Sequence, residues 1–323
     1  MRTRESIVWH WDVSRRARMT FWFARAFVKP LFTIWPTTDR GIELLATLDE
    51  LIDRLPKPKG LDIEAISLGG VPCEKITHPR PTITSMDGAT ILYFHGGGFV
   101  FCGLATHRAL CGLLAARSGA PVVSVEYRQL PKGAIGASLV DAMTAYTEVL
   151  KVCDDPSRVI VAGDSAGGYL AMKVAEVAAL RGLTRPAAVI GYSPLLNLDL
   201  EDHDPDFMKR DAYLPMSQVA KLKDRWLSGP DQIPGAQSPV NADPALFPPV
   251  FLTAAEYEIM RPDVEIITDR FDREGRQIET HIWSGQIHAF PVIGKVLRES
   301  RTIIGLTVDF ASRALTESKR HSA

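Results

Sequence analysis

The sequence lacks the features of several specialised protein classes. It has only four cysteines, Cys73, Cys102, Cys111 and Cys153, none in a Cys-x-x-Cys pair or at metal-ligand spacing from a histidine. We therefore expect reduced, mostly buried thiols and no structural metal, although an even count leaves a disulfide open. A formal net charge of −1 offers no basic excess for binding nucleic acid.

Long uninterrupted apolar runs are also missing. A membrane-spanning helix needs about 20 mainly apolar residues. The aromatic-rich stretch 19–35 is broken by Arg25, Lys29 and Pro30 and has no small-residue cleavage site, so it is not typical of a secretory signal. The composition, 46% hydrophobic and 23% charged over 323 residues, is that of a globular protein with a sizeable core. We expect a cytoplasmic protein.

The first 30 residues carry an unusual local charge. This segment has seven basic side chains and two acidic ones, a net charge of +5. Two interpretations stay open: amphipathic helices packed over the core with a solvated basic edge, or peripheral membrane attachment through basic and aromatic side chains. The oligomeric state is open as well, a homodimer included.

Apolar runs alternate with helical patterns after the proline-rich breaker at residues 56–60. The eight strand candidates are residues 65–68, 73–77, 89–94, 121–125, 158–162, 187–192, 249–253 and 277–283, and helix candidates between them are 106–118, 138–152 and 166–181. This alternation predicts an α/β fold with a mostly parallel eight-stranded sheet covered by helices on both faces.

Two segments stand outside this pattern. Residues 1–55 are predicted to be an N-terminal helical segment. Residues 197–245 are too long for a simple crossover and contain a helix candidate at 217–227, so they are predicted to be an insertion that caps the active site. The catalytic domain is then residues 56–323.

A serine between two glycines ends one of the β-favouring runs. Val-Ile-Val-Ala at residues 159–162 leads into Gly163-x-Ser165-x-Gly167, and a small-residue helix follows. A serine on so sharp a strand-to-helix turn needs small neighbours two positions before and after it. The chain has no Gly-Lys-Ser/Thr loop and no Gly-x-Gly-x-x-Gly turn, which disfavours a nucleotide loop. Ser165 is therefore the predicted nucleophile.

Three consecutive glycines follow the strand candidate that ends at residue 94. The run His95-Gly-Gly-Gly-Phe99 would lose much backbone entropy on ordering, so it is expected where bare N–H groups approach a ligand. In acyl transfer that ligand is the tetrahedral oxyanion. We expect His95 to hold this loop by hydrogen bonding and not to act as the base.

The base and the acid should follow the serine in the order acid, then base. His288, after the last strand candidate, is the best placed of the eight histidines. Three carboxylates compete to be the acid, and position favours Glu258 over Asp263 and Glu256. One carboxylate is enough to hold the imidazole in its tautomer.

Together these motifs resemble the hormone-sensitive-lipase-like family of bacterial esterases. The matching pieces lie between residues 65 and 295: residues 95–99, 163–168, Tyr127-Arg128, Ser193-Pro194 and 288–290. The resemblance implies the α/β-hydrolase fold with a helical cap, to which residues 1–55 belong by their position, and Ser165 and His288 as catalytic residues. It also implies that backbone N–H groups of Gly97, Gly98 and Ala166 form the oxyanion hole.

One departure concerns the acid, which is usually aspartate in that family. Glu258 stands at the aligned position, and glutamate can do the same work in this fold. The expected activity is hydrolysis of short- to medium-chain carboxylic esters through an acyl-enzyme, without cofactor or metal, with Phe99 and Phe290 near the substrate. The alternatives are a non-catalytic small-molecule receptor of the same fold and an amide or peptide hydrolase.

Overall fold

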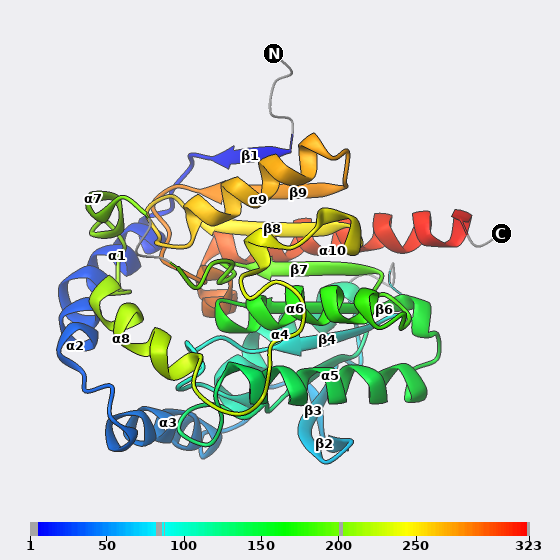
Figure 1. Ribbon diagram of the computed structural model, residues 1–323, viewed down its shortest axis with the longest axis horizontal. Coiled ribbons are helices and arrows are strands. Elements are labelled where there is room, and N and C mark those ends of the chain that lie inside the picture. The colour runs from blue at the N-terminus through cyan, green and yellow to red at the C-terminus, as the bar shows by residue number, and fades with distance from the viewer. Residues whose placement is uncertain (1–5, 82–85, 87, 200–202, 322–323) are drawn as a thin grey trace.

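A central sheet of nine strands runs through the computed structural model, which describes residues 6–81, 86, 88–199 and 203–321 (Figure 1). The eight strands expected from the sequence are all present: β2 Asp62–Leu68, β3 Val71–Thr77, β4 Thr90–Phe94, β5 Val122–Val125, β6 Val159–Asp164, β7 Ala188–Tyr192, β8 Val250–Ala255 and β9 Ile278–Trp283. The ninth, β1 (Ile7–His10), lies at one edge.

The sheet is mostly parallel, as predicted. Its order is β1-β9-β8-β7-β6-β4-β5-β3-β2, and the two antiparallel pairings are those of β3 with β2 and with β5. Strands β4, β6, β7 and β8 are buried along their whole length, because helices cover both faces. This explains their continuous apolar runs in the sequence.

Helices form a layer on each face of the sheet. On one face the core is completed by α4 (Leu104–Ser118) and α10 (Arg298–His321). On the other it is completed by α5 (Ile135–Val152), α6 (Ala166–Leu180) and α9 (Arg261–Arg273). The carboxyl ends of the parallel strands therefore open at a single edge, toward the left of Figure 1.

The prediction that residues 1–55 are helical throughout was wrong at its start. Residues Ile7–His10 form β1, which pairs in parallel with β9, Ile7 opposite Thr280 and His10 opposite Trp283. Four residues are too few to show a period-2 pattern, and their pairing partners lie 273 positions away in the chain, so the ninth strand was not predicted.

The rest of the N-terminal segment is helical. It comprises α1 (Arg15–Phe23), a π-helical turn (Ala24–Val28), α2 (Lys29–Ile34) and α3 (Asp39–Asp53). Arg2, Arg4 and Glu5, part of the basic segment, lie outside the described residues. Within the described ranges, no helix combines the length and the apolarity needed to cross a bilayer.

The predicted insertion 197–245 contains α7 (Pro205–Met208) and α8 (Met216–Trp226), and its residues 200–202 lie outside the described part. Helix α8 lies beside the N-terminal helices (Figure 1). The Gln218 side chain donates to the carbonyl of Thr33, and the Arg225 guanidinium binds the carbonyl of Thr37 and the carboxylate of Asp39. Two distant segments thus form one helical layer over the strand ends.

Candidate active site

Ser165 stands on a strained turn between β6 and α6. Its φ and ψ are 51° and −117°, a conformation that L residues rarely adopt. A Cβ on Gly163 would lie 2.3 Å from the Gly167 carbonyl oxygen, and one on Gly167 would lie 1.9 Å from that of Phe94. Both glycines are therefore required by close backbone contacts, as the spacing predicted. Ala166 begins α6, so its N–H is among those with no partner inside the helix.

The glycine-rich loop after β4 is held at several carbonyls. Gly97 and Gly98 have φ of 116° and 62°. The N–H groups of Val100 and Phe101 donate to the Gly97 carbonyl, and the indole N–H of Trp226 donates to that of Gly98 over 2.8 Å. Because its carbonyls are bound elsewhere, the loop keeps its shape despite the flexibility of glycine.

Behind this loop lies a buried ion pair that sequence reasoning missed. Asp164 Oδ1 accepts hydrogen bonds from the Tyr93 hydroxyl (2.7 Å) and the Gly96 N–H (3.0 Å), and it lies 3.2 Å from His107 Nε2. Burial alone would raise the pKa of Asp164 and lower that of His107, but their mutual attraction and hydrogen bond reverse both directions. The only local signal was a carboxylate inside the serine motif.

His95 supports the loop, as predicted, and is kept neutral. Burial and the neighbouring His107 lower its pKa to about 4. Its Nδ1 lies 2.8 Å from the Gly96 carbonyl oxygen, and its ring stacks on Tyr127 with 4.4 Å between centroids. The Tyr127 hydroxyl donates to the His95 carbonyl over 2.6 Å.

His288 and Glu258 meet beside the serine turn. His288 Nδ1 and Glu258 Oε2 are 3.0 Å apart, and both residues are buried. Burial raises the pKa of Glu258, against the opposing hydrogen bond and charge of His288. Burial disfavours the imidazolium of His288, but the hydrogen bond and charge of Glu258 outweigh it and raise the pKa of His288. His288 Nε2 is buried and has no hydrogen-bond partner among the described residues, so it is available to a group in the cavity.

The other two candidate carboxylates are engaged elsewhere. Asp263 Oδ2 lies 2.9 Å from Nε2 of His203, and its Oδ1 accepts a long hydrogen bond from Asn197. Glu256 accepts a hydrogen bond from the Ser284 hydroxyl over 2.7 Å. Among the three, Glu258 is the carboxylate that reaches the His288 ring.

Another buried carboxylate, Asp211, was not predicted from the sequence. It lies in the insertion 197–245 and connects that insertion to the loop that contains Glu258. It is fully buried, its Oδ1 accepts from the N–H groups of Tyr213 and Leu214, and its Oδ2 accepts from the N–H of Ile259 over 3.0 Å. Its charge adds to the rise in the pKa of His288. No motif marks Asp211, because two of its partners are N–H groups of an ordinary local turn and the third, Ile259, lies 48 positions away in the chain.

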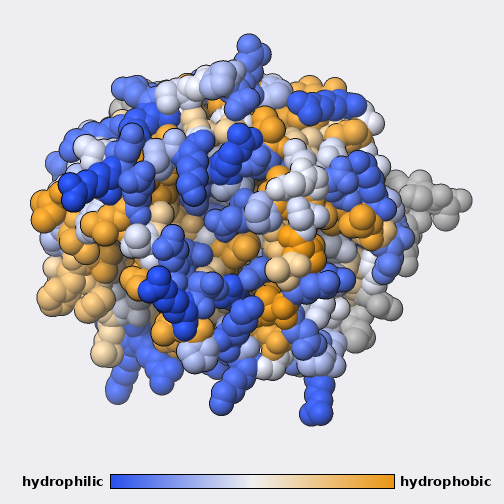
Figure 2. Space-filling view, turned by 90° about the horizontal axis from the view of Figure 1, so that it is seen from below, coloured by the Kyte–Doolittle hydropathy of each residue, from blue (hydrophilic) through white to orange (hydrophobic). Residues whose placement is uncertain are grey.

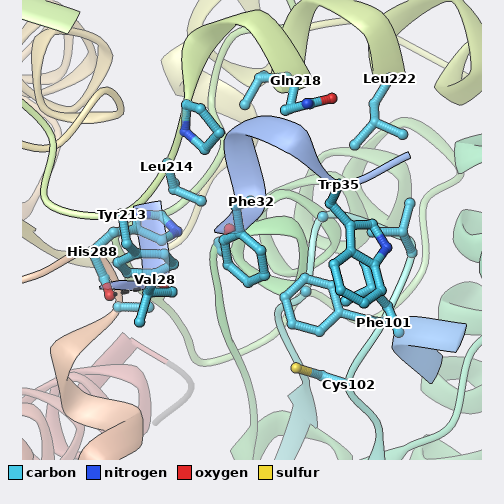
Figure 3. A pocket seen from close by; sticks show the side chains of 18 of the residues that line it. Val28, Phe32, Trp35, Phe101, Cys102, Tyr213, Leu214, Gln218, Leu222 and His288 are labelled. Carbon is cyan, nitrogen blue, oxygen red and sulfur yellow. Dashed lines mark hydrogen bonds between the residues drawn. The ribbon is translucent and has the colours of Figure 1, made fainter. Parts of the chain in front are cut away.

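These groups share one cavity of about 370 Å³. Ser165, Gly97, Gly98 and His288 line it together with mostly apolar residues. Figure 3 shows His288 and several of the apolar side chains around the cavity. The wall residues from the N-terminal segment and from the insertion include Val28, Phe32, Trp35, Leu214, Leu222 and Trp226.

The expectation that Phe99 and Phe290 contact substrate is corrected by this cavity, whose lining includes neither. Phe99 is fully buried and packs edge-on against Tyr169, and Phe290 is fully buried beside Trp283. Adjacency in sequence to a catalytic loop does not fix the direction of a side chain, and here both rings point into the core. Phe101, Phe32 and Trp35 provide aromatic surface in the cavity instead.

The cysteines and the acidic groups show no metal centre in the described part of the chain. All four cysteines are free thiols, with Cys73 and Cys111 buried. Across residues 6–81, 86, 88–199 and 203–321, no group of three or more His, Cys, Asp or Glu is placed to hold a metal ion.

Comparison with known proteins places this architecture in a family. A family model described as alpha/beta hydrolase fold matches residues 91–292. An acetyl-hydrolase of Streptomyces hygroscopicus is 31% identical, over 72% of this chain and 78% of that protein. The esterase LipU of Mycobacterium tuberculosis is 32% identical, over 65% of this chain and 73% of that protein. A hormone-sensitive lipase from a metagenome library superposes with a TM-score of 0.79 at 26% identity, over 92% of this chain and 98% of that one.

The chain therefore belongs to the α/β-hydrolase-fold family. Within it the protein is a hormone-sensitive-lipase-like serine hydrolase of the esterase class, as the motifs suggested.

Proposed function

We propose that this protein hydrolyses carboxylic esters with short- to medium-length apolar acyl chains, through Ser165, His288 and Glu258. The observation that carries the proposal is the 3.0 Å pairing of the buried His288 and Glu258 at a cavity that also contains the strained Ser165. A nucleophile, a base and a group that orients the base are the parts that acyl transfer requires.

In the first half-reaction the Ser165 hydroxyl attacks the ester carbonyl while His288 Nε2 takes its proton. Glu258 holds the Nδ1–H of His288 and stabilises the imidazolium that forms. The N–H groups of Gly97, Gly98 and Ala166 donate to the new oxyanion, at the positive end of α6. His288 then returns the proton to the departing alcohol, and an acyl-enzyme remains.

In the second half-reaction water attacks the acyl-enzyme by the same route. His288 takes a proton from the water and returns it to Ser165 as the tetrahedral adduct collapses to the free acid. The raised pKa of His288 suits this role, because the imidazolium formed at each step is stabilised where it is needed.

The cavity favours apolar acyl groups of limited length. Its volume of about 370 Å³ is at the small end of the range of roughly 300–1,000 Å³ for ligand pockets. Its walls carry few polar side chains, so an uncharged acyl chain loses little on leaving water. We assign the π-helical turn Ala24–Val28, α2, α3 and α8 the role of the cap, because side chains from each of them line the cavity that contains Ser165.

A series of p-nitrophenyl esters from acetate to palmitate tests the proposal. Wild-type protein should turn over the acetate to octanoate esters best, and Ser165→Ala should lose at least about 10⁴-fold in kcat. Absence of turnover by folded wild type with every ester would favour a receptor. Faster turnover of matched p-nitroanilides would favour an amidase.

Peripheral contact of the N-terminal helices with an anionic membrane is the second part of the proposal. The exposed fractions of Met19, Trp22, Phe23 and Phe27 are 71%, 60%, 61% and 66%. Figure 2 shows apolar side chains gathered at the edge where the N-terminal helices lie in Figure 1. Aromatic side chains beside exposed basic ones are the combination that binds a lipid surface.

Co-sedimentation with vesicles tests this contact. Wild-type protein should pellet with phosphatidylserine-containing vesicles, less with pure phosphatidylcholine vesicles, and less again after Trp22→Ser with Phe27→Ser. Equal recovery in the supernatant for wild type and the double variant would refute it. A change in the oligomeric mass of the double variant would assign the apolar face to a second copy of the chain.

A further inference from the structure

Trp226, the last residue of the cap helix α8, touches the oxyanion loop directly. Its indole Nε1–H donates to the carbonyl oxygen of Gly98 over 2.8 Å, and its side chain is almost fully buried. Its ring meets Phe99 edge-on, with 6.1 Å between centroids. It also lines the cavity that contains Ser165.

The other anchors of the loop come from the body of the protein. The Gly96 N–H is bound by Asp164, the His95 carbonyl by Tyr127, and the Phe99 carbonyl by the N–H of Leu130. The Gly97 carbonyl is bound within the loop itself. The Gly98 carbonyl is bound by the cap.

The conformation of Gly98 depends on such anchors. Gly97 and Gly98 both have positive φ and no side chains to restrict rotation. The Gly98 N–H shares a peptide plane with the Gly97 carbonyl, and the Gly98 carbonyl lies in the next plane, so holding both carbonyls fixes the two planes that meet at the Gly98 Cα. An oxyanion donor works only when it is aimed in advance at the place where negative charge develops.

Helix α8 is in turn tied to the N-terminal helices. Arg225, the residue before Trp226, binds the Thr37 carbonyl and the Asp39 carboxylate, and Gln218 binds the Thr33 carbonyl. A continuous set of contacts therefore leads from the N-terminal segment through α8 to Gly98.

We propose that Trp226 is a positioning residue that aligns the oxyanion donors only when the cap is docked. The inference rests on the proposed function, since it gives the loop its role in acyl transfer. It predicts that the indole N–H contributes to stabilising the transition state and little to binding the ground-state ester.

Trp226→Phe removes the N–H and keeps an aromatic ring. With p-nitrophenyl butyrate we expect kcat to fall about 10- to 100-fold, less than the roughly 10²–10³-fold loss caused by removing an oxyanion donor outright, while KM changes less than about threefold. A hexyl trifluoromethyl ketone, whose carbonyl carbon bonds to Ser165 Oγ and whose oxygen becomes the oxyanion, should bind more weakly by the same factor as kcat/KM falls.

Trp35 offers a matched control. It also lines the cavity, and its indole N–H donates to a glycine carbonyl over 2.9 Å, but that glycine is Gly41, within the cap. Trp35→Phe should act mainly on KM and leave the ratio of ketone affinity to ester KM close to that of wild type.

Replacing Trp226 by 3-benzothienylalanine, which has the indole shape without the N–H, keeps the test valid if the phenylalanine variant is unstable. The inference is overturned if either Trp226 variant, folded as judged by its melting temperature, keeps wild-type kcat and ketone affinity or changes KM alone. Inactivity of the wild-type protein itself would refute the proposed function instead.

Discussion

Ser165, Glu258 and His288 lie on a body whose central strands are buried from end to end, whereas the helices above the cavity expose many of their apolar side chains. In the body, polar groups bind one another at short range, as in the pairs of His107 with Asp164 and of His288 with Glu258. In the cap, Arg225, Gln218 and Lys29 bind backbone carbonyls of other segments.

The contrast indicates that the two regions carry different constraints. The body requires particular residues, because a glycine or a carboxylate there meets fixed neighbours on all sides. The cap requires amphipathic helices of suitable length, because a bond to a backbone carbonyl does not depend on which side chain that carbonyl belongs to. Side-chain identity should therefore affect chemistry mainly in the body and substrate or surface contacts mainly in the cap, with Trp226, which reaches the oxyanion loop, as the exception.

The largest expected effect concerns the two carboxylates of the body. Glu258→Gln should lower kcat by about 10⁴-fold, because an amide leaves the His288 tautomer unsupported. The matched change Asp263→Asn removes a buried carboxylate paired with His203 and should leave kcat within about tenfold of wild type. Initial rates with p-nitrophenyl butyrate compare them, and the reverse ranking would move the acid to Asp263.

Two glycine substitutions compare the stability cost of a Cβ in tight backbone contact with that of a Cβ in open space. Gly167→Ala places a Cβ 1.9 Å from the Phe94 carbonyl oxygen and should cost about 3 kcal/mol or more in the free energy of unfolding. Gly182→Ala has a φ of 65° and nothing within 4 Å, so only the left-handed conformation costs energy, about 1–2 kcal/mol. Urea unfolding measures both, and equal losses would contradict the difference.

The pH dependence of kcat/KM should report the environment of His288 in the body. Because the pKa of His288 is raised, imidazolium persists to higher pH than usual and cannot accept the Ser165 proton. The acidic limb of kcat/KM should therefore rise through a pKa above the ordinary value of about 6.5. The acidic limb of Phe27→Ser, a substitution in the cap, should have the same pKa as that of wild type. A wild-type limb below pH 6.5 would refute the stabilised imidazolium.

The smallest effects on stability and turnover are expected from substitutions on the exposed side of the cap. Phe27→Ser and Met19→Ser change side chains that are 66% and 71% exposed, so each should alter the free energy of unfolding by no more than about 0.5 kcal/mol. Turnover of p-nitrophenyl acetate in solution should stay near that of wild type. A large loss of stability would mean that this apolar face is packed against something in the native protein.

The features that depend on local backbone geometry could be predicted from the sequence. The glycines at positions 163 and 167 are required by the turn that carries Ser165, and the alternating apolar runs specify eight of the nine strands. The glycine loop and the histidine loop followed from their order in the chain. Such features are readable because each depends on residues a few positions apart.

The remaining features depend on contacts between segments that are distant in the chain, and the folded structure was needed to see them. It added β1, whose partner is β9, and it turned Phe99 and Phe290 into the core. In the folded protein Glu258 pairs with His288 and Asp263 pairs with His203, whereas the spacing in the sequence left open which carboxylate would meet His288. The pairing of His107 with Asp164 arises in the same way, because the position of a buried polar side chain is set by whichever partner the fold brings within hydrogen-bond distance.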